Sequence, residues 1–398
     1  MVNLSATHDS LRFENPFVLA SGPPTAAREL IERGFAAGWA GAVTKTIRPD
    51  SMPMEDVSPR FYALRDGQGD VFGFENIELV SRRSTAYWME TIAGLKRGHP
   101  GKILIASIMG DSGRESWADL ARRCEAAGAD ALELNFSCPH GMPERGVGAA
   151  IGQDAGITGR IAGWVRGATR LPVIVKLTPN VTDVRPIALA AIEAGANALA
   201  AINTVQCLAG VDLETLSPCP PVNGQSAFGG YSGAAIKPIG LRVVAQAAAA
   251  TKAPIHGLGG IRTWKDAVEY MAVGATVVQV CTEVMIRGFG LVRGMVEGLA
   301  GYLKRKSLAS PSDLTGAALG RLVSHEALSR EYRAIPEMVA PAACRLCGRC
   351  AAACRDGGYH ALRLENRSVS CDAAKCDGCS LCARVCPSGA LAMRAVII

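Results

Sequence analysis

Three segments of the chain share one hydrophobic pattern, in which a helical stretch ends at a glycine and a continuous apolar run follows. They are Glu125–Asn135, Glu193–Asn203 and Met271–Cys281, and Phe35–Lys45 is a looser fourth. The glycine suits the left-handed position that ends a helix. The apolar run suits a parallel strand that is covered on both faces. The pattern therefore predicts repeated helix–turn–strand units.

Counted in chain order, the apolar runs predict eight strands, and a helical stretch follows each of them. The strands lie near residues 17, 41, 103, 130, 173, 198, 254 and 276. Eight alternating units over about 300 residues are typical of a TIM (β/α)8 barrel. A doubly wound sheet is the alternative, although it usually needs fewer units. We expect an α/β barrel over residues 1–304, a helical linker over 305–340 and a separate α+β module over 341–398.

The composition indicates a globular protein, with 49% hydrophobic and 20% charged residues among 398. The net charge of +6 is too small and dispersed to favour nucleic acid as a partner. The first 16 residues lack the apolar core of a signal peptide. The longest apolar run, Ile187–Ile202, is interrupted by Glu193 and is too short to span a bilayer. We therefore expect a cytoplasmic protein that does not bind membranes.

Polar residues stand at equivalent positions where the predicted strands end. Lys45, Asn135 and Cys281 come seven residues after the turn glycine, and Asn203 comes eight after it. Lys176 is near the end of the fifth strand. In a barrel the carboxyl ends of the strands carry the chemistry, so this rim is the expected functional site. The alternative is a set of solvated loop residues.

Cysteines are concentrated in the last 55 residues, which hold nine of the 14 in the chain. The run C-x2-C-x2-C-x3-C occurs twice, as in two-cluster ferredoxins, where the fourth cysteine of each run binds the other cluster. Zinc knuckles are the alternative, but they seldom use this spacing. Cys371 has no place in the pattern and is interpreted as a spare buried thiol. One [4Fe–4S] cluster is expected on Cys344, Cys347, Cys350 and Cys386, and the other on Cys376, Cys379, Cys382 and Cys354.

A barrel joined to two clusters needs a centre that handles both single electrons and hydride, and flavin does both. No G-x-G-x-x-G follows a predicted strand, so FMN is favoured over FAD. Its phosphate would suit the rim of strands 7 and 8, at Gly259, Gly260, Cys281 and Thr282.

Two long loops, after the fourth and sixth strands, are expected to cover the flavin. Cys138 opens the first loop, three residues beyond Asn135, and a thiol there could deliver a proton during reduction. His140 is a rival acid. Cys207 and Cys219 lie on the other loop, about residues 205–234, and receive no role.

Five short motifs stand at Asn15–Ser21, Thr44–Thr46, Asn135–Met142, Lys176–Asn180 and Ile202–Thr204. Together they resemble the dihydropyrimidine dehydrogenases, within the wider dihydroorotate dehydrogenase-like flavoproteins. The resemblance is to the bacterial catalytic subunit and to the C-terminal part of the long animal enzyme, and it covers nearly the whole chain. One departure is Leu258, where the animal enzyme has Thr.

The resemblance implies reduction of uracil or thymine to the 5,6-dihydro product. Hydride would pass from flavin N5 to C6, and Cys138 would protonate C5 as the general acid. FMN would be held by Ser21, Lys45, Thr46, Lys176, Gly233, Gly259, Gly260, Cys281 and Thr282. The pyrimidine would be held by Asn76, Asn135, Ser137, Asn203 and Thr204.

The resemblance also implies a hetero-oligomer with a PreT-type flavoprotein subunit that carries FAD and binds NAD(P)H. Electrons would enter from that partner, cross the two clusters and reach FMN. Three alternatives stay open: oxidation of dihydroorotate, reduction of another cyclic imide or enone, and a non-catalytic electron carrier. Dihydroorotate is a carboxylate, whereas the candidate substrate-binding side chains are neutral.

Overall fold

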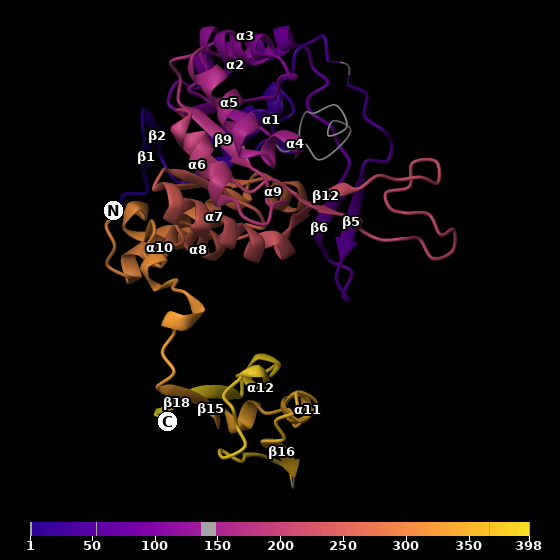
Figure 1. Cartoon of the computed structure of the whole chain (residues 1–398), viewed down its shortest axis with the longest axis vertical. Coiled ribbons are helices and arrows are strands. Elements are labelled where there is room, and N and C mark those ends of the chain that lie inside the picture. Colours follow the sequence, from indigo (N-terminus) through magenta and orange to yellow (C-terminus); the bar gives the residue numbers. More distant parts are fainter. Residues whose placement is uncertain (1, 53, 137–148, 366, 398) are drawn as a thin grey trace. The chain divides into compact units, whose positions relative to one another are not determined.

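The computed structural model describes residues 2–52, 54–136, 149–365 and 367–397. It divides into two compact units, Met1–Arg321 and Leu322–Ile398 (Figure 1). Within the described ranges, no helix combines the length and the apolarity that crossing a bilayer requires.

Eight parallel strands of the first unit close into a barrel, in the order β10-β13-β14-β3-β4-β7-β8-β9. This closure confirms the predicted barrel and excludes the doubly wound alternative. The strands are β3 (Phe17–Leu19), β4 (Gly41–Val43), β7 (Ile103–Ile108), β8 (Ala131–Asn135), β9 (Val173–Leu177), β10 (Ala198–Ala201), β13 (Ile255–Leu258) and β14 (Val277–Val280).

Helices follow the strands because the intervening segments repeat apolar residues at helical spacing. On α3, the apolar positions Trp117, Leu120, Ala121 and Cys124 are all buried. The helices of the first unit are α1 (Arg28–Ala37), α2 (Thr85–Gly98), α3 (Arg114–Ala126), α4 (Ala149–Gly152), α5 (Ala155–Arg166), α6 (Arg185–Glu193), α7 (Lys237–Thr251), α8 (Trp264–Ala272), α9 (Thr282–Arg287) and α10 (Leu291–Arg305).

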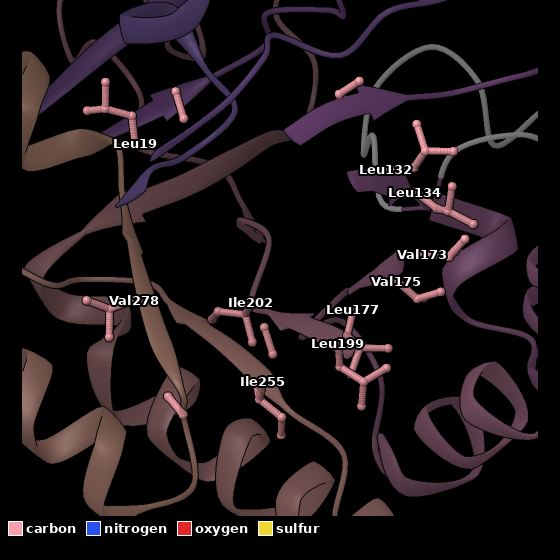
Figure 2. Packing of buried hydrophobic residues seen from close by; sticks show 14 of the residues in the cluster. Leu19, Leu132, Leu134, Val173, Val175, Leu177, Leu199, Ile202, Ile255 and Val278 are labelled. Carbon is pink, nitrogen blue, oxygen red and sulfur yellow. The ribbon is translucent and has the colours of Figure 1, made fainter. Parts of the chain in front are cut away.

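The two faces of each barrel strand belong to different parts of the core. On β9, Val173, Val175 and Leu177 belong to the larger apolar cluster, which includes the helices (Figure 2). Ile174, between them, belongs to a second cluster that fills the barrel interior. This alternation follows from the period of two in a strand. Lys176 shares the inward face with Ile174.

A short hairpin contributes to the interior cluster. It consists of β1 (Ala6–His8) and β2 (Leu11–Phe13), which pair antiparallel. Its apolar residues Ala6, Leu11 and Phe13 are buried with the inward-facing residues of the barrel strands.

A separate four-stranded sheet is built from the segments that follow β4 and β10. Its order is β11-β12-β6-β5, with β5 at Phe61–Arg65, β6 at Val71–Asn76, β11 at Val205–Cys207 and β12 at Gly229–Gly233. The second of these segments was expected as a long covering loop. The β5–β6 hairpin was not foreseen from the sequence.

Among its described residues, the second unit contains two antiparallel strand pairs and two short helices. Strand β15 (Tyr332–Met338) pairs with β18 (Leu391–Ile397), and β16 (Leu362–Glu365) pairs with β17 (Ser368–Cys371). The helices are α11 (Arg349–Asp356) and α12 (Leu381–Arg384). Residues 305–340, expected as a helical linker, contain three 3-10 turns and β15.

The turn glycines adopt the left-handed backbone that the sequence pattern predicts. The φ angle is +93° at Gly128 and +115° at Gly274. At Gly274 a Cβ would also overlap the Cβ of Ala248, whereas at Gly128 nothing lies within 4 Å of the added atom. A substitution at Gly128 therefore tests backbone strain alone, whereas a substitution at Gly274 tests backbone strain together with steric overlap.

Gly274→Ala is expected to lower the free energy of unfolding of the barrel by more than about 2 kcal/mol, because overlap adds to a left-handed penalty of about 1–2 kcal/mol. Gly128→Ala meets only this penalty and should lower the free energy of unfolding by about 1–2 kcal/mol. Urea denaturation followed by tryptophan fluorescence measures both. Equal losses in the two variants would contradict the role given to the contact with Ala248.

Candidate functional site

A pocket with an empty volume of about 1150 Å³ opens where the barrel strands end. Its walls come from all around the barrel and from the separate sheet, which contributes Phe61 and Ser232. Every residue expected to hold FMN lines it, namely Ser21, Lys45, Thr46, Lys176, Gly233, Gly259, Gly260, Cys281 and Thr282. Of the residues expected to hold the pyrimidine, Asn76, Asn135, Asn203 and Thr204 line it as well.

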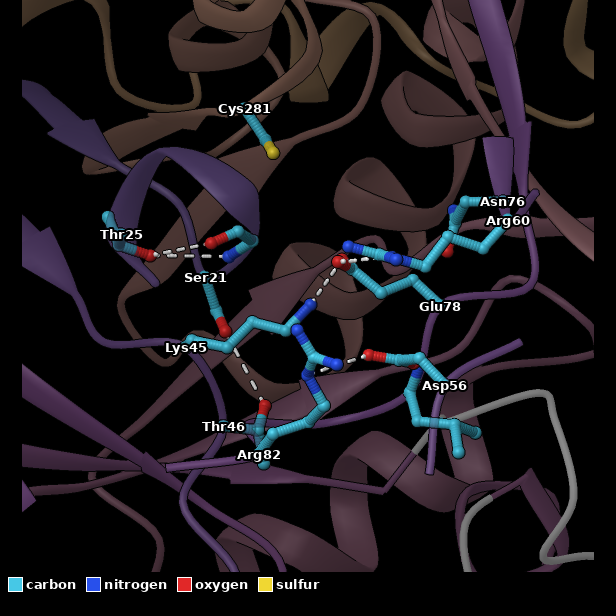
Figure 3. Close-up of polar contacts among 12 residues, drawn as sticks. Ser21, Thr25, Lys45, Thr46, Asp56, Arg60, Asn76, Glu78, Arg82 and Cys281 are labelled. Carbon is cyan, nitrogen blue, oxygen red and sulfur yellow. Dashed lines mark hydrogen bonds and ion pairs between the residues drawn. The ribbon is translucent and has the colours of Figure 1, made fainter. Parts of the chain in front are cut away.

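A belt of hydrogen bonds joins strand ends on one side of the pocket. Thr46 Oγ1 is at its centre, 3.4 Å from Ser21 Oγ and 3.0 Å from Ser107 Oγ. Asn135 Nδ2 donates to the same oxygen at 3.0 Å. Figure 3 shows Ser21 and Thr46 facing each other. The belt fixes the Asn135 amide relative to neighbouring strand ends.

The belt continues to the end of β10. Asn203 Nδ2 donates to Asn135 Oδ1 at 3.3 Å, and Asn203 Oδ1 accepts from the Thr204 backbone N–H at 2.9 Å. Asn180, which follows β9, donates to the Thr204 carbonyl at 3.2 Å and accepts from the Gln206 N–H at 2.8 Å. Asn180 therefore positions the segment that carries Asn203 and Thr204, two of the candidate substrate-binding residues.

Two charged residues that the sequence pattern does not indicate, Arg60 and Glu78, flank the β5–β6 hairpin. Lys45 forms an ion pair with Glu78, which lies two residues beyond β6 and lines the pocket. Arg60 Nε lies 3.3 Å from the other carboxylate oxygen of Glu78 (Figure 3). On β6, Asn76 Nδ2 donates to the Gly230 carbonyl at 3.0 Å. Because these contacts join distant segments, no local spacing indicates them.

A second ion pair lies deeper, on the inward faces of β8 and β9. Lys176 Nζ is 3.4 Å from Glu133 Oε1, and the two side chains are 6% and 0% exposed. A buried ammonium needs such a partner because isolated charges are costly to bury. Both lysines of the pocket are thus paired with carboxylates.

The turn after β13 carries glycines with left-handed backbone, with φ of +117° at Gly259 and +73° at Gly260. A Cβ on Gly260 would lie 2.8 Å from the Lys237 backbone N. A turn without side chains lets backbone N–H groups approach a phosphate. Together with the pocket's size and its paired lysines, this donor set fits FMN.

Cys281 lies against the same wall. Its Sγ is 2.5 Å from the position that a Cβ on Gly22 would take, so only glycine fits at that position. Burial raises the pKa of the Cys281 thiol to about 11, although the Lys45 and Lys176 ammonium groups oppose the shift. At neutral pH the group is therefore a thiol and contributes packing rather than a thiolate nucleophile.

Two candidates, Ser137 and Cys138, lie outside the described residues, as does the rival acid His140. They follow β8 directly in the chain, and β8 ends at Asn135 on the pocket wall. Of the two cysteines without a role, Cys219 is buried and Cys207 is half-buried. Neither lines the described pocket.

The second unit contains two cavities lined by cysteines, with empty volumes of about 350 and 300 Å³. The first is lined by Cys344, Cys347, Cys350 and Cys386. The second is lined by Cys354, Cys376, Cys379 and Cys382. These are the two sets expected from the crossed ferredoxin pattern, so the donor chemistry fits two [4Fe–4S] clusters. Cys371 lines neither cavity.

Comparison with known proteins gives the same division of the chain. The family model for dihydroorotate dehydrogenase matches residues 3–303, and the model for a 4Fe-4S dicluster domain matches residues 338–393. The chain is 38% identical to the NAD-dependent dihydropyrimidine dehydrogenase subunit PreA of Escherichia coli (strain K12) over 394 residues, which cover 98% of this chain and 95% of the relative.

Two further relatives match the chain over shorter lengths. The chloroplastic dihydropyrimidine dehydrogenase (NADP(+)) of Arabidopsis thaliana is 38% identical, over 83% of this chain and 80% of its own length. The catalytic subunit of dihydroorotate dehydrogenase B (NAD(+)) of Pyrococcus abyssi is 37% identical, over 78% of this chain and 97% of its own. The chain therefore belongs to the dihydroorotate dehydrogenase family of flavin-dependent oxidoreductases, and it carries a 4Fe-4S dicluster domain after the barrel.

Proposed function

We propose that this chain is the catalytic subunit of an NAD(P)-dependent dihydropyrimidine dehydrogenase, which interconverts uracil or thymine and the 5,6-dihydro product. The observation that carries the proposal is the neutral polar wall of the pocket, formed by Asn76, Asn135, Asn203 and Thr204. Amides and hydroxyls both donate and accept hydrogen bonds, as the alternating N–H and C=O groups of a cyclic imide require.

The charges of the pocket favour this substrate over dihydroorotate. The cationic side chains that line its described part are Lys45, Lys176 and Arg262. Each forms an ion pair, with Glu78, Glu133 and Glu283 respectively. The carboxylate of dihydroorotate would therefore have to compete with Glu78, Glu133 or Glu283 for a cationic side chain. A neutral imide needs no cationic partner.

The chain's own residues would bind and orient the pyrimidine ring and exchange a proton with it. When bound, FMN supplies hydride chemistry. The asparagine and threonine side chains hold and orient the ring, and their positions are fixed by the hydrogen-bond belt. Cys138 exchanges the proton at C5 of the substrate. Glu78 and Arg60 hold Lys45 against the pocket wall.

The electron route extends to a partner. Two clusters in the cysteine-lined cavities would carry single electrons, and a PreT-type flavoprotein subunit would supply them from NAD(P)H through FAD. The relative from Escherichia coli supports this arrangement, because its name describes an NAD-dependent subunit and it aligns over both units of this chain.

The proposed activity is tested with the anaerobically purified full chain, after its FMN and iron have been measured. Dihydrouracil, dihydrothymine and dihydroorotate are supplied separately with an artificial electron acceptor. We expect turnover of the dihydropyrimidines, because they match the neutral wall. Turnover of dihydroorotate alone would overturn the substrate assignment. Absence of FMN would favour the electron-carrier alternative.

The proton-donor role is tested by Cys138→Ala. We expect the variant to keep its FMN and iron and to lose about 10²–10⁴-fold in turnover, since general acid catalysis contributes about that much. His140→Ala is the control and should keep most of the turnover. Loss of turnover in His140→Ala, with turnover kept in Cys138→Ala, would instead make His140 the acid.

The cluster assignment is tested by Cys350→Ala, with Cys371→Ala as the matched control from the same apolar cluster of the second unit. Loss of one ligand should remove one cluster and about half of the iron, since each cluster holds four irons. The control should keep all of its iron. Iron analysis and EPR spectra of the reduced protein distinguish the two variants. Full iron in Cys350→Ala would contradict the assignment.

A further inference from the structure

The barrel interior contains a connected set of polar side chains around the Lys176–Glu133 pair. Gln279, on β14, donates through Nε2 to Glu133 Oε2 at 2.9 Å. The same nitrogen lies 3.1 Å from Nδ1 of His256, on β13. Gln279 is 1% exposed and His256 is 0% exposed. The Glu133 carboxylate is thus held by an ammonium on one side and an amide on the other.

The set extends to the β1–β2 hairpin. His256 Nε2 lies 2.7 Å from Nε2 of His8, which ends β1. His8 Nδ1 lies 3.1 Å from the carboxylate of Asp9, which is 31% exposed. A continuous series of contacts therefore joins the FMN pocket to a solvent-exposed carboxylate in the turn between β1 and β2.

Chemistry assigns the hydrogens along this series. A carboxylate only accepts, so Gln279 must face Glu133 with its NH2 group. His256 Nδ1, which faces the same NH2 group, must then accept. A neutral His256 carries its proton on Nε2 and donates it to His8. Burial lowers the pKa of both imidazoles, and that of His256 falls well below its usual value.

The arrangement leaves Gln279 with one orientation. Both of its N–H groups are used, and its Oε1 has no hydrogen-bond partner among the described residues. Turning the amide over would set Oε1 against the Glu133 carboxylate. Stability alone does not require such a network, because apolar residues of similar volume often serve as well in a protein core. Its connection to Lys176 in the pocket suggests a function there.

We propose that Gln279 is a positioning residue, which fixes the charge balance of the Lys176–Glu133 pair beside the flavin and is itself oriented by His256. An ammonium near the flavin stabilises its reduced, more negative form, and the Glu133 carboxylate offsets part of that effect. The Gln279 amide stabilises the carboxylate through a hydrogen bond. This inference rests on FMN binding in the pocket, which is part of the proposed function.

The test measures the midpoint potential of FMN in the full chain by spectroelectrochemical titration without pyrimidine, after FMN content has been determined. Gln279→Leu removes the hydrogen-bond donor to Glu133, so the negatively charged form of the carboxylate becomes less stable. The positive charge of Lys176 is then less compensated by Glu133 and stabilises the reduced flavin more strongly. The midpoint potential should therefore shift to a more positive value. Because no substrate is present, failure of the substrate assignment does not affect the result.

The orienting role is tested by two substitutions at one position. His256→Asn keeps an acceptor near Nδ1 and should keep the wild-type potential. His256→Leu removes the acceptor and should shift the potential in the direction of Gln279→Leu, by a smaller amount. Ile174→Val, in the same interior cluster, controls for packing and should leave the potential unchanged.

Three results would overturn the proposal. One is a wild-type potential in FMN-loaded Gln279→Leu, and another is an equal shift in Ile174→Val. If Gln279→Leu does not fold, the two His256 variants provide the test instead. Equal potentials in His256→Leu and His256→Asn would then reject the proposal. A chain that binds no FMN would instead reject the proposed function.

Discussion

Closure of eight parallel strands into a barrel is the constraint on which the rest of the first unit depends. Because every strand runs in the same direction, every carboxyl end reaches one rim, and residues far apart in the chain meet there. Thr46 and Asn135 thus share a hydrogen bond although 89 positions separate them. The same closure creates an interior, which this chain fills partly with charged and polar groups.

Much of this arrangement could be predicted because it is periodic. In four segments a glycine after a helix sets the start of the next strand, so counting forward from it finds Lys45 and Asn135 on the pocket wall. The two cysteine runs are equally local, and their spacing predicts which four thiols surround each cavity. Each cysteine run is short, and the exchange of the fourth cysteine between the two runs follows from the two-cluster ferredoxin pattern.

Other features depend on contacts that no local pattern encodes. Glu78 reaches Lys45 from the segment that follows the β5–β6 hairpin, and 33 positions separate the two residues. Glu133 and Gln279 each interrupt an apolar strand, but their pairing across the barrel requires knowing both the closure and the register. Polar residues within predicted buried strands were the available signal. The role of Cys138 stays a prediction from resemblance.

The central claim is that one chain joins pyrimidine chemistry at the barrel rim to electron transfer in the cysteine-lined cavities. It is tested most directly by EPR of the anaerobic full chain, loaded with FMN and iron and mixed with dihydrouracil alone. The account predicts signals from reduced [4Fe–4S] clusters without any partner protein, because electrons from the substrate can pass on from the flavin. Clusters that stay oxidised with dihydrouracil and dihydrothymine, but become reduced with dihydroorotate, would contradict it.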